Sequence, residues 1–315
     1  MPNLFMKLLV GSLGALMLLG LVIAGVAWVL VERIIRPKKP HPFGHYTISP
    51  FELGLPVENV TFAPRIGRHR VSGWYLSAPG ARTTIVVSPG YRTRKTQVIG
   101  VVNFLWRAGF NVLAFEYYGH GAIGGVPVTL GYREKEDFLG ALAYARQRAP
   151  ESHIGVLAYS MGAAIALLCA ADHPEIEAVI ADSAFATHTS AVRYNLRRTL
   201  HVPPAPFLWV GDRLLHLRAG YRFHQVEPLR AIARLAPRPV LLIHGGRDTI
   251  VDPHDAALLY RAAQDSKTLW IVPEADHCGA YFEDRAKYVS RIVGFFEKHL
   301  GGKSEAYNQQ RKQDE

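Results

Sequence analysis

The sequence predicts an α/β protein built on a mostly parallel β-sheet with helices on both faces. Two observations predict this class: short apolar runs of strand length recur along the chain, and amphipathic segments of helix length alternate with them. The chain has 315 residues, of which 49% are hydrophobic and 20% are charged. This balance is typical of a globular protein, and the length allows one large core with appended segments.

The alternation assigns each element to a stretch of sequence. Residues 57–65 and 71–78 are predicted as two early strands of the sort that form an antiparallel edge. Further strands are predicted at 83–88, 111–118, 153–160, 177–184, 238–245 and 267–274. Helices between or after them are predicted at 96–109, 134–148, 161–174, 252–264 and 286–300. Reactive groups in such sheets gather at the carboxyl ends of strands, so polar residues just beyond those ends are candidate site residues.

Residues 1–36 are predicted to be a membrane anchor with a basic flank, outside the fold. The chain from Leu8 to Val31 has 24 residues without a charged side chain. As a helix it would extend about 36 Å, enough to cross a hydrocarbon core of about 30 Å. A cleavable signal peptide is the alternative, because residues 25–27 (Gly-Val-Ala) are small, but the apolar run exceeds the usual h-region of about 7–15 residues. More basic residues follow the span than precede it, so the positive-inside rule favours a cytoplasmic domain on a single-pass anchor.

The net charge and the cysteine content of the chain indicate which kinds of partner and site to expect. A formal net charge of +10 and a pI near 9.6 indicate attraction to anionic surfaces. The sequence has no nucleic-acid motif, so lipid headgroups are the predicted partner and nucleic acid is not. The two cysteines, Cys169 and Cys278, are far apart and form no CxxC pair, which disfavours a disulfide framework or a cysteine metal site. Residues 37–50 are predicted as a proline-rich linker, 51–300 as the globular domain and 301–315 as a loose polar tail.

Three polar residues at strand ends form a candidate catalytic set. Ser160 ends one predicted strand, and Asp248 and His277 each follow another. A serine hydroxyl is a weak nucleophile at neutral pH and requires a base within hydrogen-bonding reach. His277 is the predicted base, and Asp248 is predicted to hold its tautomer and stabilise the imidazolium. A serine at such a junction can also be a simple helix N-cap, so the prediction depends on all three residues occurring in this order.

The turn around the serine departs from the usual pattern for a nucleophile. Such serines commonly lie in G-x-S-x-G, whereas here Ala158 replaces the first glycine and Gly162 keeps the second. Alanine adds one methyl group, so we interpret the change as tolerated. The backbone N–H of Met161, at the start of the following helix, is a predicted donor to a substrate oxyanion. The N–H of Tyr91 is the second, because Gly90 before it lets the backbone approach closely.

Residues from about 55 to 300 resemble the alpha/beta-hydrolase superfamily, especially its single-domain bacterial branch of serine aminopeptidase-like and acyl-hydrolase-like proteins. The segments SPGY, FEYYGHG, AYSMG, ADSAF, PRPVLLIHGGRD and ADHCG occur in the order that the family shows. The resemblance implies an eight-stranded sheet with a helical lid. It also implies Ser160 as nucleophile, Asp248 as acid and His277 as base, with oxyanion donors at Tyr91 and Met161. The sequence has no metal-binding cluster, phosphate loop or dinucleotide fingerprint, and an oxyanion hole removes the need for a cofactor, so we expect neither a metal nor a cofactor.

The resemblance also bears on residues that could take the role of the base or the acid. His120 and His244 are alternative bases, and both become structural under the resemblance. Asp182 also ends a strand and is the alternative acid, although the chain order favours Asp248. Pro89 stands where the family often has histidine, which concerns the second oxyanion donor and not the triad.

The predicted function is a membrane-anchored serine hydrolase that cleaves carboxylic esters or thioesters through an acyl-enzyme. Its substrate is a small molecule or a lipid acyl compound. Peptide amides are a variant, and a non-catalytic scaffold that binds a ligand or a partner is the other alternative. Residues 186–228 are the predicted lid, rich in arginine and aromatic residues. This lid either meets lipid headgroups and admits an acyl chain, or packs its apolar side on the core with its arginines in water. The sequence leaves the oligomeric state open.

Overall fold

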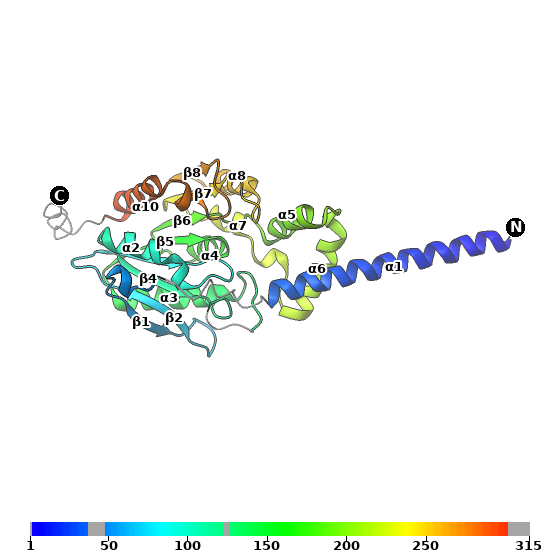
Figure 1. Cartoon of the computed structure of the whole chain (residues 1–315), viewed down its shortest axis with the longest axis horizontal. Helices are drawn as coiled ribbons and strands as arrows, with labels where there is room; N and C mark the ends of the chain where they lie inside the picture. The colour runs from blue at the N-terminus through cyan, green and yellow to red at the C-terminus, as the bar shows by residue number, and fades with distance from the viewer. Residues whose placement is uncertain (1, 37–47, 122–125, 302–315) are drawn as a thin grey trace.

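The computed structural model describes residues 2–36, 48–121 and 126–301, which form one long helix attached to a layered α/β domain (Figure 1). The predicted proline-rich linker falls largely on residues 37–47, and the predicted tail falls on 302–315. Both stretches lie outside the described residues.

The domain is centred on an eight-stranded sheet with the order β1-β2-β4-β3-β5-β6-β7-β8. Strand β2 runs antiparallel to its neighbours β1 and β4, and the other adjacent strands are parallel. This confirms the predicted parallel sheet with an early antiparallel edge. The strands are β1 (Glu58–Phe62), β2 (Val71–Leu76), β3 (Thr83–Ser88), β4 (Asn111–Glu116), β5 (His153–Tyr159), β6 (Ala178–Asp182), β7 (Val240–Gly245) and β8 (Lys267–Val272).

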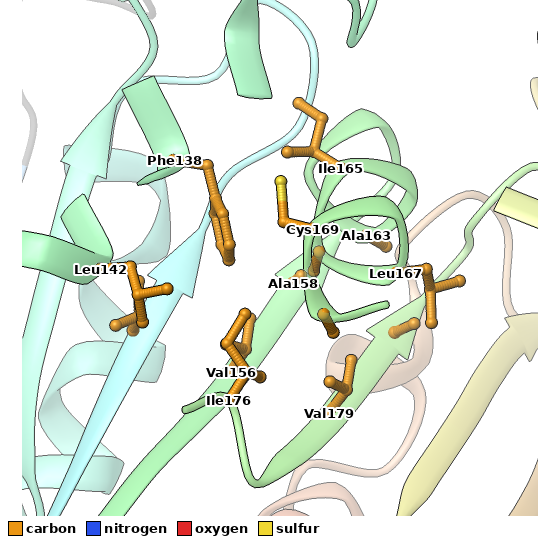
Figure 2. Packing of buried hydrophobic residues seen from close by; sticks show 14 of the residues in the cluster. Phe138, Leu142, Val156, Ala158, Ala163, Ile165, Leu167, Cys169, Ile176 and Val179 are labelled. Carbon is orange, nitrogen blue, oxygen red and sulfur yellow. The ribbon is translucent and has the colours of Figure 1, made fainter. Parts of the chain in front are cut away.

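Helices cover both faces of the sheet, as predicted. Because side chains along a strand alternate between faces, Val156 and Ala158 of β5 lie in one core cluster while Leu157 and Tyr159 lie in the other. Figure 2 shows part of the first cluster, between β5 and the helices beside it. The first face is covered by α3 (Glu134–Arg148), α4 (Met161–Ala170), α7 (Pro228–Ile232) and α8 (Pro253–Ala262). The second is covered by α2 (Ile99–Arg107), α9 (Ala280–Glu283) and α10 (Arg285–Leu300).

The segment predicted as a lid contains two helices, α5 (His188–Leu200) and α6 (Pro204–Ala219). The amino-terminal helix α1 (Pro2–Ile35) projects away from the domain, and its last turns lie beside α6 (Figure 1). Within these turns Val31 and Ile35 are buried in a third apolar cluster, with Phe185, Leu215 and other residues near the lid. Most of the large apolar side chains of α1 are exposed. Among the described helices, α1 is long and apolar enough to cross a membrane.

Candidate active site

Ser160 occupies a tight turn between β5 and α4. Its φ of 52° is unfavourable for a residue with a side chain, and strain of this kind is concentrated at functional sites. The helix side of the turn requires glycine, because a Cβ at Gly162 would lie 2.7 Å from the carbonyl oxygen of Ser88 and closer still to that of Pro89. The strand side does not, because Ala158 lies within the core cluster beside α4 (Figure 2). The packing therefore explains why alanine replaces the first glycine and not the second.

The structure brings the three predicted residues Ser160, Asp248 and His277 together. In the loop after β8, His277 has its Nε2 2.8 Å from the Oγ of Ser160 and its Nδ1 2.7 Å from the Oδ2 of Asp248. With the aspartate ionised, Nδ1 carries the ring proton and donates a hydrogen bond to the carboxylate. Nε2 is then unprotonated and accepts a hydrogen bond from the serine hydroxyl. This is the geometry that a general base needs. The catalytic roles themselves stay predictions.

Asp248, in the loop after β7, is buried and fully bonded. Its Oδ1 accepts the backbone N–H groups of Ile250, at 2.8 Å, and Val251, at 2.9 Å. The Nε2 of His244 lies 3.2 Å from Oδ2, the oxygen that also contacts His277. Burial raises the pKa of this carboxyl, but the two histidines and the backbone donors outweigh burial and hold the pKa well below its ordinary value. The contact between His244 and Asp248 is one that the sequence prediction did not include.

The two predicted oxyanion donors border the serine. Met161 is the first residue of α4, and the N–H groups of a first helical turn have no partner within the helix. A Cβ at Gly90 would lie 3.3 Å from the Cβ of Ser160, so the loop after β3 passes directly beside this serine. Tyr91 follows in that loop, and both it and Met161 line the cavity next to the serine. Their role as donors stays a prediction.

His120 does not serve the triad but supports the loop that contains Tyr91. Its Nδ1 accepts the backbone N–H of Arg92 at 3.2 Å, and its Nε2 lies 3.1 Å from Oε1 of Glu134. The ring packs edge-to-face on Tyr91, with 5.2 Å between ring centroids. Burial raises the pKa of Glu134, but hydrogen bonds from His120 and Thr129 outweigh it and lower the pKa to about 2. Glu134 was not a predicted site residue.

A family model and several bacterial proteins match this sequence. Residues 79–215 match the family model described as serine aminopeptidase, S33. The uncharacterized protein YqkD of Bacillus subtilis is 28% identical over 258 residues, which cover 81% of this chain and 83% of YqkD. The uncharacterized protein YfhR of Escherichia coli O157:H7 is 28% identical over 248 residues, covering 76% of this chain and 80% of YfhR.

Solved structures share the fold. The esterase Pf2001 of Pyrococcus furiosus aligns with a TM-score of 0.67 at 23% identity, covering 84% of this chain and 100% of the esterase. The chain has the alpha/beta-hydrolase fold. The esterase domain of a Rhodothermus marinus protein also aligns with this chain, with a TM-score of 0.58 at 21% identity, covering 78% of this chain and 100% of the domain. The eight-stranded fold that the sequence resemblance implied is therefore confirmed.

Asp182, the alternative acid, belongs to a different hydrogen-bond chain. Its Oδ2 accepts the hydroxyl of Tyr288 at 2.9 Å, and its Oδ1 accepts the hydroxyl of Ser183 at 3.1 Å. The Oγ of Ser183 in turn accepts the backbone N–H of Cys278 at 3.1 Å. Asp182 thus supports the backbone next to His277 and does not contact the imidazole.

The Asp182→Asn variant should show a stability difference from wild type that depends on pH. Burial raises the pKa of Asp182 to about 6, above its ordinary 3.8. As pH rises from about 4 to about 6, Asp182 loses its proton more readily in the unfolded state than in the folded state. The free energy of unfolding of wild type therefore falls by up to about 3 kcal/mol, a loss that the uncharged amide of Asp182→Asn does not cause. Below this window and above it the difference stays constant. Thermal unfolding of both proteins in detergent across pH 4–8 measures it.

The Asp172→Asn variant, which removes an exposed carboxylate, is the matched control for the substitution itself. If the stability of Asp182→Asn relative to wild type stays constant, or falls, between pH 4 and 6, the carboxyl does not hold its proton as the structure implies.

A cavity of about 360 Å³ opens beside Ser160, at the lower end of the range for ligand pockets. Its walls come from α1, α5 and the loops after the strands. Lining residues are Leu30, Arg33, Ile34, Tyr91, Leu130, Ser160, Met161, Phe185, Ala191, Val192, Asn195, Leu196, Thr199, Ile250 and Val251. None of these described residues is acidic, and most are apolar.

Proposed function

We propose that the protein is a membrane-anchored serine hydrolase that cleaves carboxylic ester or thioester bonds through an acyl-enzyme. The observation that supports this most directly is the pair of hydrogen bonds made by His277, 2.8 Å to the hydroxyl of Ser160 and 2.7 Å to the carboxylate of Asp248. The similarity of the fold to that of solved esterases also supports an ester hydrolase.

In the proposed first step, Nε2 of His277 removes the hydroxyl proton of Ser160 while Oγ bonds to the carbonyl carbon of the substrate. The N–H groups of Tyr91 and Met161 donate to the resulting oxyanion. The tetrahedral intermediate then breaks its bond to the leaving oxygen or sulfur, which takes the proton from the imidazolium. Water, deprotonated by the same imidazole, attacks the acyl carbon and releases the carboxylic acid and the free serine.

The lining of the cavity favours esters over the amide substrates of an aminopeptidase. An aminopeptidase has to bind a protonated amine close to the scissile bond, and a buried ammonium needs an acidic partner. The described lining residues provide apolar surface and Arg33 as their only charged side chain. An uncharged acyl group is therefore the better fit.

The packing of α1 supports a retained anchor over a cleaved signal peptide. Ala27, at the small-residue site where a peptidase would cut, is buried in the folded protein. Val31 and Ile35 continue the same helical face and are buried as well. The basic residues after the span support a cytoplasmic domain, which a reporter fused after Glu315 tests directly.

Fluorophosphonate labelling of the full-length protein tests the nucleophile. We expect one covalent adduct on the peptide that contains Ser160, identified by mass spectrometry, because an activated hydroxyl displaces fluoride from phosphorus. The Ser160→Ala variant should remain unlabelled. Ser190→Ala, which alters another partly buried serine, is the control and should be labelled like wild type. An adduct that persists in Ser160→Ala would rule out this serine as the nucleophile.

Hydrolysis of p-nitrophenyl esters and of aminoacyl p-nitroanilides then distinguishes ester from amide chemistry. We expect the esters to be the better substrates. Faster turnover of the anilides would contradict the ester assignment while leaving the nucleophile in place.

A further inference from the structure

The last turns of α1 form one wall of the cavity beside the nucleophile. Leu30 and Ile34, four residues apart on one side of the helix, both line it. The end of the helix is fixed by two hydrogen bonds: the hydroxyl of Tyr91 donates to the carbonyl of Ile34 at 2.9 Å, and the N–H of Val128 donates to the carbonyl of Ile35 at 2.8 Å. The proposed membrane anchor is therefore part of the substrate site and not a separate tether.

A second groove adjoins this cavity and is positively charged. The two hollows share Arg33 and Tyr91, which line both. The lining residues of the groove are Trp28, Val29, Glu32, Arg33, Arg36, Tyr91 and Arg92. Glu32, its one acidic residue, is already bonded by Arg218 from α6, with oxygen–nitrogen distances of 2.7 and 2.8 Å. The groove thus keeps an excess of positive charge suited to a phosphate or carboxylate.

The position of this groove along α1 matches a membrane surface. Exposed apolar side chains of α1 run from Leu4 to Val29, and the groove begins at Trp28. With that apolar stretch in a bilayer, Arg33 and Arg36 lie at the depth of the headgroups, where tryptophan and arginine are also favoured. The apolar cavity is then reached from the bilayer edge, alongside the helix.

We propose that the substrate is a single-chain amphiphilic ester with an anionic headgroup, taken from the membrane surface. This inference depends on the proposed esterase function of Ser160. The acyl chain fills the apolar cavity, the ester carbonyl lies at the serine, and the anionic headgroup lies in the arginine groove. Leu30 and Ile34 contact the chain, and Arg33 contacts the headgroup.

The test compares esters that share a lauroyl chain on glycerol and differ in the headgroup, using the full-length protein in neutral detergent micelles. The probes are lauroyl lysophosphatidylglycerol, which is anionic, lauroyl lysophosphatidylcholine, which is zwitterionic, and monolauroylglycerol, which is uncharged. Release of lauric acid measures kcat/KM for each. We expect the anionic ester to be preferred about 10-fold or more over the uncharged one, as one charge-assisted contact allows.

Variants connect that preference to the two hollows. Arg33→Gln should lower the ratio of anionic to uncharged turnover about 10-fold, whereas Arg230→Gln, an exposed arginine on α7, should keep the wild-type ratio. Leu30→Trp, which fills the cavity, should lower the ratio of p-nitrophenyl laurate to p-nitrophenyl acetate turnover. Val22→Trp, on the exposed part of α1, should keep it.

The outcomes separate this inference from the proposed function. If p-nitrophenyl acetate is hydrolysed in a Ser160-dependent way but the anionic ester is not preferred, or if Arg33→Gln leaves the ratio unchanged, the substrate assignment is wrong and the esterase stands. If no ester of any kind is turned over, both fail.

Discussion

Replacing His277 by alanine is expected to lower kcat for a p-nitrophenyl ester by about 10⁴- to 10⁶-fold. Without the imidazole, nothing accepts the hydroxyl proton of Ser160 or returns a proton to the leaving group. Residual catalysis then comes from substrate binding and the oxyanion donors alone. Initial-rate kinetics on matched preparations measure the loss. His153→Ala is the control, because His153 is an exposed histidine paired with Glu177 and should keep wild-type kcat.

The double variant Ser160→Ala/His277→Ala makes this prediction more specific. Residues that act as one unit have strongly non-additive effects, so the double variant should be no slower than either single variant within a few-fold. A double variant slower than both single variants by a further factor of about 100 would show that serine and histidine act independently. The 2.8 Å contact between them would then be only structural.

The sequence predicts the sheet and the meeting of Ser160, Asp248 and His277 because both follow from the positions of the strands and their ends. A wholly apolar run of six to eight residues can only be a buried strand or a short helix, and the alternation with amphipathic helices decides for strands. Carboxyl ends of parallel strands lie at one edge of the sheet. Ser160, Asp248 and His277 therefore converge, although 117 positions separate the first from the last.

The support around the triad has no comparable signal in the sequence. Glu134 begins a helix in which Glu136 and Asp137 also lie in the first turn, so its carboxylate is indistinguishable from ordinary helix-terminal charge. Only the fold brings it to His120 and hence to the loop with Tyr91. His244 lies inside an apolar strand, and its contact with Asp248 depends on how the following loop turns back.

The sequence does not predict the packing of α1 against the domain either, for a different reason. In a helix that is apolar all round, the buried face at Ala27, Val31 and Ile35 does not differ in hydrophobicity from the exposed face. The absence of charged residues predicts the length of the span. It does not predict which side of α1 contacts the segment predicted as a lid. Glu32 breaks the apolar run, yet its partner Arg218 lies 186 positions away in α6.

Gly162→Ala is the second substitution expected to have a large effect, because it adds a single methyl group where the backbone leaves no space. The new Cβ would press on the carbonyl oxygens of Ser88 and Pro89, which lead directly into the loop with Tyr91. Relief requires α4 or this loop to move, and either movement separates a proposed oxyanion donor from the serine. We expect kcat to fall about 10²- to 10³-fold and the free energy of unfolding to fall by about 1–3 kcal/mol.

Ala158→Gly, the reverse exchange on the other side of the serine, is the matched control. It removes a buried methyl group from the core beside α4 and adds backbone freedom, which should cost about 1–2 kcal/mol of stability. The loop with Tyr91 stays in place, so kcat should remain within about three-fold of wild type. Ester kinetics and thermal unfolding of the two variants separate the effects. If Gly162→Ala keeps full activity, the close contact between α4 and the loop does not position the oxyanion donors. If Ala158→Gly instead raises kcat strongly, the alanine restrains the turn, contrary to the packing seen here.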